Sequence, residues 1–150
     1  MTQPRAREHG RTLSFSISCI PPKATSQQKG VMVIGGHPRF FKKKHVKQAE
    51  DSLMTMLMPH RPEKPFAGPV KLTVYWTYPW RKSEKKSVIA QGCAPCDTRP
   101  DCSNLVKLFE DCLTTLNFWN DDSQVYSLTF EKYWGNVPGI EVRIEGRGDE

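Results

Sequence analysis

Four stretches of the chain alternate apolar and polar side chains, which is the pattern of half-buried β-strands. The alternation is complete in residues 70–78 and in residues 140–145, where apolar residues alternate with charged ones in the second case. Residues 13–19 and 123–134 follow the same two-residue period. Two short apolar runs that flank Gly35–Gly36 predict a hairpin over residues 31–41.

Two other stretches repeat their apolar residues with the period of a helix. Residues 41–58 show this period, and residues 105–116 show it most clearly, with Ser103 in the expected N-cap position. Between the strand over 70–78 and the second helix, residues 81–103 predict one long loop. The order strand, hairpin, helix, strand, helix, strand, strand predicts an α/β (α+β) fold, in which two main helices pack on a single mixed β-sheet.

The length of 150 residues is that of one domain. We expect residues 1–11 to form a disordered basic tail, residues 12–146 a single domain and residues 147–150 a short tail. Neither a membrane span nor an apolar secretory segment is recognisable, which predicts no membrane partner, a cytoplasmic location and reduced cysteines.

Charge is distributed unevenly along the chain. Residues 1–50 carry ten Lys and Arg against two Asp and Glu, whereas residues 101–150 carry four against ten. One part could therefore bind a polyanion and the other could bind cations, although an unevenly charged solvated surface is the simpler alternative. The basic residues that could follow DNA phosphates are Lys23, Lys29, Arg39, Lys42, Lys43, Lys44, Lys47, Arg81 and Lys82, with Lys85 and Lys86 beside them.

Carboxylates flank the second predicted helix. Asp101 precedes it, and Asp121 and Asp122 follow it in a tight turn. The helix is roughly 20 Å long, so the two groups meet only if the chain after Asp122 runs back along the helix. Turn acids are also common simply because they stabilise the turn, and the spacing alone does not separate the two interpretations.

Residues 99–125, RPDCSNLVKLFEDCLTTLNFWNDDSQV, resemble the RusA-type Holliday-junction resolvases. That family carries a D-x-D-N-L-x-K motif at the start of a helix, then an aromatic residue and a D-D-x-Q-V motif that enters a strand. The matching positions are Asp101, Asn104, Leu105, Lys107, Trp119, Asp121, Asp122, Gln124 and Val125. The order of the elements extends the resemblance over most of the chain.

The resemblance implies a homodimeric endodeoxyribonuclease that depends on Mg²⁺, with Mn²⁺ as a possible substitute, and cuts four-way or other branched double-stranded DNA. It implies Asp101 and Asp122 as catalytic, metal-binding acids, Asp121 as a supporting metal ligand, and Lys107 as the cation that faces the phosphate. Carboxylate oxygens suit Mg²⁺, and a lysine can neutralise charge on the transferring phosphate. An i,i+4 ion pair with Asp111 is the structural alternative for Lys107.

One motif position departs from the family. Ser103 stands where the second acid of D-x-D-N is expected. Three interpretations remain open: Asp97 or Asp121 replaces the missing acid, the protein binds branched DNA without cutting it, or Ser103 is only an N-cap and a water takes the place of the carboxylate. Reduced but retained activity is the interpretation we favour.

The cysteines suggest a rival function, a zinc-stabilised interaction module. Cys93 and Cys96 form a C-x₂-C pair, and Cys102 follows in the same predicted loop. A second C-x₂-C is missing, and the histidines have no matching spacing, so incidental loop thiols are the favoured interpretation and zinc is not expected. We expect Cys112 and Cys19 to belong to the core.

Overall fold

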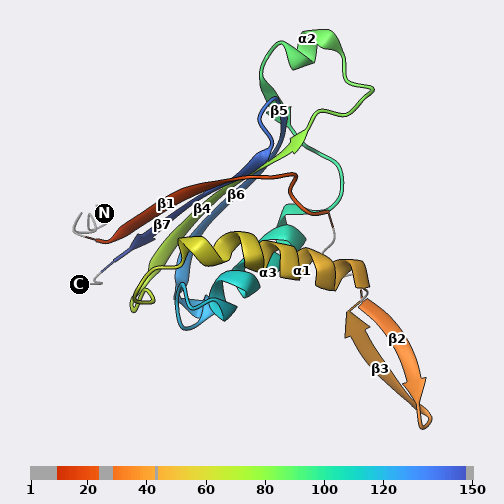
Figure 1. Cartoon of the computed structure of the whole chain (residues 1–150), viewed down its shortest axis with the longest axis vertical. Coiled ribbons are helices and arrows are strands. Elements are labelled where there is room, and N and C mark those ends of the chain that lie inside the picture. Colours follow the sequence, from red (N-terminus) through yellow and green to blue (C-terminus); the bar gives the residue numbers. More distant parts are fainter. Residues whose placement is uncertain (1–9, 24–28, 43, 148–150) are drawn as a thin grey trace, which may run out of the picture.

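A computed structural model describes residues 10–23, 29–42 and 44–147, and it contains one five-stranded sheet (Figure 1). The strands lie in the order β1-β7-β4-β6-β5, in which β4 and β6 are parallel and the other neighbours are antiparallel. Their bounds are β1 (Thr12–Ser18), β4 (Val70–Pro79), β5 (Cys93–Pro95), β6 (Val125–Gly135) and β7 (Gly139–Gly146). The predicted mixed sheet is therefore confirmed.

The two main helices, α1 (Lys44–Leu57) and α3 (Cys102–Thr115), lie on the same face of this sheet (Figure 1). Short helical segments complete the chain: the 3₁₀ turns η1 (Met58–His60) and η2 (Asp122–Gln124), and the four-residue helix α2 (Lys86–Ile89). None of the helices in the described residues has the length and apolar run that a bilayer crossing needs.

The core lies between the sheet and the helices. The alternating residues of β4 from Val70 to Tyr78 are buried, and the apolar stripe of α3 packs against them. The rings of Trp76 and Phe109 meet edge to face with centroids 5.8 Å apart. Burial of such aromatic pairs on one face explains why the two-residue and 3.6-residue periods were readable in the sequence.

Strands β2 (Lys29–Ile34) and β3 (His37–Lys42) form the predicted hairpin as a separate two-stranded sheet. Gly35 and Gly36 join them with φ angles of 58° and 80°. A two-residue hairpin turn with both φ angles positive favours glycine, which lacks a Cβ, at both positions.

Three local predictions were wrong. The first helix begins at Lys44 rather than 41, because Phe41 and Lys42 belong to β3. The stretch 81–103, predicted as a loop, contains α2 and β5, which are too short to display a sequence period. Asp101 rather than Ser103 occupies the N-cap position of α3, with extended φ and ψ of −67° and 147°, and Ser103 lies inside the first helical turn.

The predicted tails lie mostly outside the described residues. At their inner ends, Arg11 donates a hydrogen bond to the carbonyl of Lys64 at 2.6 Å and its guanidinium lies over the ring of Phe66. At the other end, the backbone N–H of Arg147 donates to the carbonyl of Pro69 at 2.9 Å. Both residues therefore contact the loop that leads into β4.

Candidate active site

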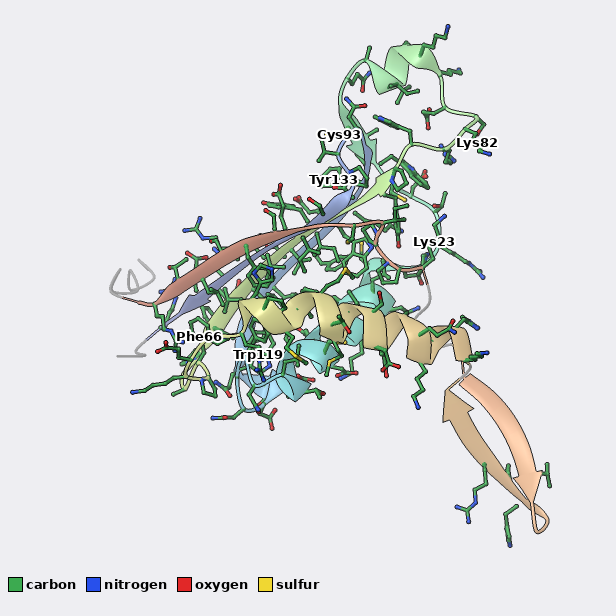
Figure 2. The ribbon with its side chains drawn as sticks, viewed as in Figure 1. Lys23, Phe66, Lys82, Cys93, Trp119 and Tyr133 are labelled. Atoms are coloured by element: carbon green, nitrogen blue, oxygen red, sulfur yellow. The ribbon has the colours of Figure 1, made fainter. Side chains whose placement is uncertain are left out.

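Asp122 is held by two side chains of helix α3. The Thr114 hydroxyl donates a hydrogen bond to Asp122 Oδ1, and the Lys107 ammonium lies 3.4 Å from Asp122 Oδ2. The indole N–H of Trp119, a fully buried side chain, donates to the Thr114 hydroxyl at 2.7 Å. Figure 2 shows Trp119 near Phe66, with which it forms an isolated β-bridge. The buried tryptophan thus fixes the threonine, which in turn fixes the carboxylate.

The turn that carries Asp122 is fastened to a neighbouring loop by Gln124. The side-chain amide N–H₂ donates to the carbonyls of Phe66 at 2.7 Å and Gly68 at 3.0 Å. The side-chain oxygen accepts from the backbone N–H groups of Asn120 at 2.8 Å and Asp121 at 3.0 Å. These four bonds match the two donors and two lone pairs of the amide. The glutamine of the D-D-x-Q-V motif therefore positions the turn.

The charge state of Asp122 follows from its neighbours. Partial burial raises its pKa, but the hydrogen bonds from Thr114 and Lys107 and the positive charge of Lys107 outweigh it, and the net pKa lies below the usual value. The pKa of Lys107 is raised, chiefly by its hydrogen bond and charge contact with Asp111 at 3.0 Å. Lys107 therefore makes the i,i+4 ion pair with Asp111 that was the structural alternative, and it also contacts Asp122, which the sequence did not predict; its side chain remains 54% exposed.

Helical spacing places Ser103 on the same face of α3 as Lys107 and Thr114. Residues four and seven positions apart lie in one row along a helix. Glu110 belongs to this row, and burial, followed by the negative charge of Asp122, raises its pKa. Neither Thr114 nor Glu110 was identified from the sequence as a site residue. Both lie on the polar side of the predicted helix, in the same row as Lys107, and this position was a usable signal. A carboxylate at position 103 would project from the same face as the Lys107 ammonium.

Asp121 is used mainly to shape its own turn. Its Oδ1 accepts a hydrogen bond from the backbone N–H of Ser123 at 2.8 Å, and together with Gln124 it forms a capping box at η2. This backbone bond is the main reason that the pKa of Asp121 is lowered. The alternative that a turn acid stabilises its own turn thus holds for Asp121.

Asp101 lies at the end of a segment that is clamped to β6. The buried ammonium of Lys132 donates hydrogen bonds to the carbonyls of Thr98 and Pro100, the second at 2.7 Å. The backbone carbonyl of Lys132 accepts from the N–H of Cys96 at 2.9 Å. The structural role of Lys132 was not predicted from the sequence. The signal was its position two residues after Phe130 in an alternating strand, which places a charged side chain on the core side of the sheet.

The three acids proposed from the sequence do not form one cluster. Within the described parts of the chain, no three His, Cys, Asp or Glu side chains are grouped so that they could hold a metal ion. The turn after α3 does fold back along the helix, because Asp122 reaches Lys107. Asp101, however, lies at the start of the helix. Lys107, which Asp122 contacts, is six residues further on, about 9 Å along the helix axis at 1.5 Å per residue.

The basic residues proposed to contact DNA lie on several surfaces. Lys44 and Lys47 are exposed on α1, and Arg39 is exposed on β3. The backbones of Lys29 and Lys42 belong to the hairpin, but their side chains, and all of Lys43, lie outside the described residues.

The other basic candidates lie in the segments that follow β1 and β4, outside the hairpin and α1. Arg81 and Lys82 are exposed before α2, where the Arg81 guanidinium pairs with Glu84 at 3.1 Å and lies 5.0 Å from the centre of the Trp134 ring. The Lys23 ammonium lies 5.6 Å from the centre of the Tyr78 ring. Figure 2 shows Lys23 and Lys82 on the same side of the molecule.

The thiols do not support a zinc site in the described structure. Cys93 is exposed, while Cys96 is buried with its Sγ 3.5 Å from the Thr98 hydroxyl. Cys102 is half-buried at the start of α3, and the described residues provide no set of three possible metal ligands around these thiols. Cys112 is in the core, and half-buried Cys19 packs against it, as predicted.

The match to a known family covers most of the chain, including α3 and the turn that carries Asp122. The sequence profile described as endodeoxyribonuclease RusA matches residues 20–145. The chain belongs to the RusA endodeoxyribonuclease family. The crossover junction endodeoxyribonuclease rusA of Lactococcus phage r1t is 30% identical over 130 residues, which cover 87% of this chain and 93% of the relative.

A second relative is the uncharacterized protein YqaN of Bacillus subtilis (strain 168). It is 38% identical over 90 residues, which cover 57% of this chain. The matched region is 63% of that relative, so this chain spans less than two thirds of its length.

RusA-family proteins generally depend on a metal ion. Mg²⁺ is commonly held by one or two carboxylates together with waters and substrate phosphates, so it does not need three acids. Asp122 is ionised and half-buried, and Glu110 and Asp111 are close enough to share its electrostatic environment. The donor chemistry around Asp122 therefore fits a hard cation.

Proposed function

We propose that this RusA-family protein is a Mg²⁺-dependent, structure-specific endodeoxyribonuclease that hydrolyses phosphodiester bonds in four-way or other branched DNA. The observation that carries the proposal is the contact of Asp122 with Lys107 and Thr114. The contact combines two charges: the ionised Asp122 carboxylate, which Thr114 and the buried Trp119 hold in place, and the exposed Lys107 ammonium on α3. The carboxylate can hold the metal ion that phosphodiester hydrolysis uses, and the ammonium can neutralise charge that develops on the phosphate.

In this proposal Asp122 binds the metal ion together with waters and the substrate phosphate, and Lys107 contacts the scissile phosphate. Asp101, at the start of α3, is a second metal-binding acid that would have to approach Asp122 when the substrate binds. The bound ion would polarise the phosphate and lower the pKa of an attacking water. Lys107 neutralises charge that develops on the phosphate oxygens. Asp121 is a supporting ligand through Oδ2, since its Oδ1 accepts the capping hydrogen bond.

We further propose that the active form is a homodimer. A two-fold symmetric dimer would present two identical sites to a four-way junction, which has pseudo-two-fold symmetry, and would make paired cuts. Analytical ultracentrifugation tests this directly. A sedimenting species of one chain, alone and on the junction, would contradict the dimer.

A second candidate is a protein that binds branched DNA without cutting it. The location of Ser103 favours this alternative, because a neutral hydroxyl occupies a place on the polar face of α3 where the family motif has an acid. A hydroxyl is a weaker ligand for Mg²⁺ than a carboxylate.

A cleavage assay separates the two candidates. A labelled synthetic four-way junction is incubated with the native protein in Mg²⁺ or Mn²⁺, in parallel with Asp101→Asn and Asp122→Asn. Paired symmetric nicks that both substitutions abolish support the nuclease. Junction binding without nicks in either metal supports the binder, and neither binding nor cutting contradicts both.

A further inference from the structure

The β2–β3 hairpin stands apart from the rest of the described structure (Figure 1). Its strands pair with each other from Lys29↔Lys42 at the base to Ile34↔His37 at the tip, and they form a sheet of their own. An isolated two-stranded hairpin is only marginally stable in water. A hairpin that projects in this way gains stability when it docks on another surface.

In the sequence, the hairpin and the start of α1 belong to one continuous cationic stretch. Residues 9–49 contain no Asp or Glu, and residues 29–47 contain six Lys and Arg together with His37 and His45. Near the tip, Arg39 and His37 are exposed, and Val33 is 72% exposed. This charge is complementary to a polyanion.

The shape of the hairpin also suits DNA. The major groove is about 12 Å wide and admits a two-stranded β-ribbon. Strands of six residues extend for about 20 Å at 3.3 Å per residue, which reaches well beyond the first turns of α1. Exposed Lys44 and Lys47 at the base of the hairpin could contact phosphates while the tip lies in the groove.

We propose that the β2–β3 hairpin is a DNA-binding arm that enters a groove of one duplex arm of the branched substrate. The inference rests on the proposed DNA substrate and adds a specific contact outside the candidate active site. A hairpin-to-hairpin contact between two copies would bring the same positive charges together, which disfavours that alternative.

Truncation tests the proposal. Gly30 and Phe41 are paired across the hairpin, so an Asn-Gly turn can replace residues 31–40 and keep the base of the ribbon. Binding to a four-way junction is measured without divalent metal at 50–200 mM salt, together with hydroxyl-radical footprints. We expect at least a tenfold loss of affinity and a footprint that is shorter on the duplex arms.

Point substitutions provide a matched comparison that does not depend on the truncated protein folding. Arg39→Ala should reduce the slope of log K against log salt by about 1. Arg143→Ala makes the same charge change on the sheet face away from the helices, and it should leave the slope unchanged. Circular dichroism establishes that each variant is folded.

The possible outcomes are distinct. If the native protein binds no branched DNA, the proposed function and this inference fall together. If the native protein binds and the truncated or Arg39→Ala protein has the same affinity, footprint and salt slope, only the hairpin proposal is overturned. It is also overturned if truncation converts a dimer into a monomer with an unchanged footprint, which would assign the hairpin to a second copy of the chain.

Discussion

The Lys107 ammonium lies 3.4 Å from a carboxylate oxygen of Asp122, although 15 residues separate the two in the sequence. Lys107 projects from the middle of α3, and Asp122 opens the η2 turn that follows the helix. The contact exists because the chain reverses direction after the helix. It joins the two segments that carry the family's motif residues into one electrostatic unit.

The first prediction concerns Asp122 and its neighbour in sequence. Asp122→Asn removes the charge that faces Lys107, and we expect junction cleavage to fall at least 100-fold with little change in junction affinity. Asp121→Asn makes the same charge change, but asparagine caps a helical turn as well as aspartate does. We expect it to lose about tenfold or less. Equal losses in single-turnover cleavage would contradict the separate roles assigned to the two acids.

The second prediction restores the missing acid of the motif. Ser103→Asp places a carboxylate on the face of α3 that carries Lys107 and Thr114. We expect cleavage to reach half its maximum at a lower Mg²⁺ concentration than in the native protein, because a carboxylate binds this ion better than a hydroxyl does. Ser103→Asn serves as a control of similar size without the charge. An unchanged Mg²⁺ titration for Ser103→Asp would show that position 103 does not face the metal.

The third prediction tests the cause of the lowered pKa of Asp122. Thr114→Val removes a hydrogen bond to the ionised carboxylate, so the pKa of Asp122 should rise toward its usual value. Carbon NMR of the side-chain carboxyl measures it. Thr114→Ser, which keeps the hydroxyl, should keep the low pKa.

The same substitution has a predicted effect on stability. A carboxyl whose pKa is lower in the folded state stabilises the fold above its unfolded pKa of about 4, and this contribution disappears as the pH falls through the folded pKa. The pH-dependent part of the difference in unfolding free energy between native protein and Thr114→Val should therefore be largest near neutral pH and vanish in acid. A difference that is the same at pH 7 and pH 2.5 would contradict this linkage.

The fourth prediction concerns the clamp that precedes Asp101. Lys132→Met leaves the carbonyls of Thr98 and Pro100 without their donor, which typically costs about 1–3 kcal/mol of stability. We expect slower cleavage with unchanged junction affinity, because the segment that leads to Asp101 is no longer held. Lys71→Met removes the same charge from the other face of the sheet and should change neither. Parallel losses of cleavage and affinity in Lys132→Met would indicate a direct contact with DNA instead.

Regular patterns in the sequence were sufficient for the main elements. The alternation in 70–78 and the helical period in 105–116 predicted β4 and α3, because each element buries one face and its side chains must follow the repeat of the backbone. The glycine pair at 35–36 predicted the hairpin for a similarly local reason. Helix α2 and strand β5 escaped prediction because three or four residues complete no recognisable period.

By itself, the sequence determined the longer strands, the two main helices, the charge asymmetry and the motif residues, since these depend on local periodicity and residue type. Only the tertiary structure decided that Asp122 turns toward Lys107 and that a buried lysine from β6 holds the segment before Asp101. Those relations join residues from separate elements. They depend on how the chain reverses after α3 and on the parallel pairing of β4 with β6, and no local pattern in the sequence encodes such distances.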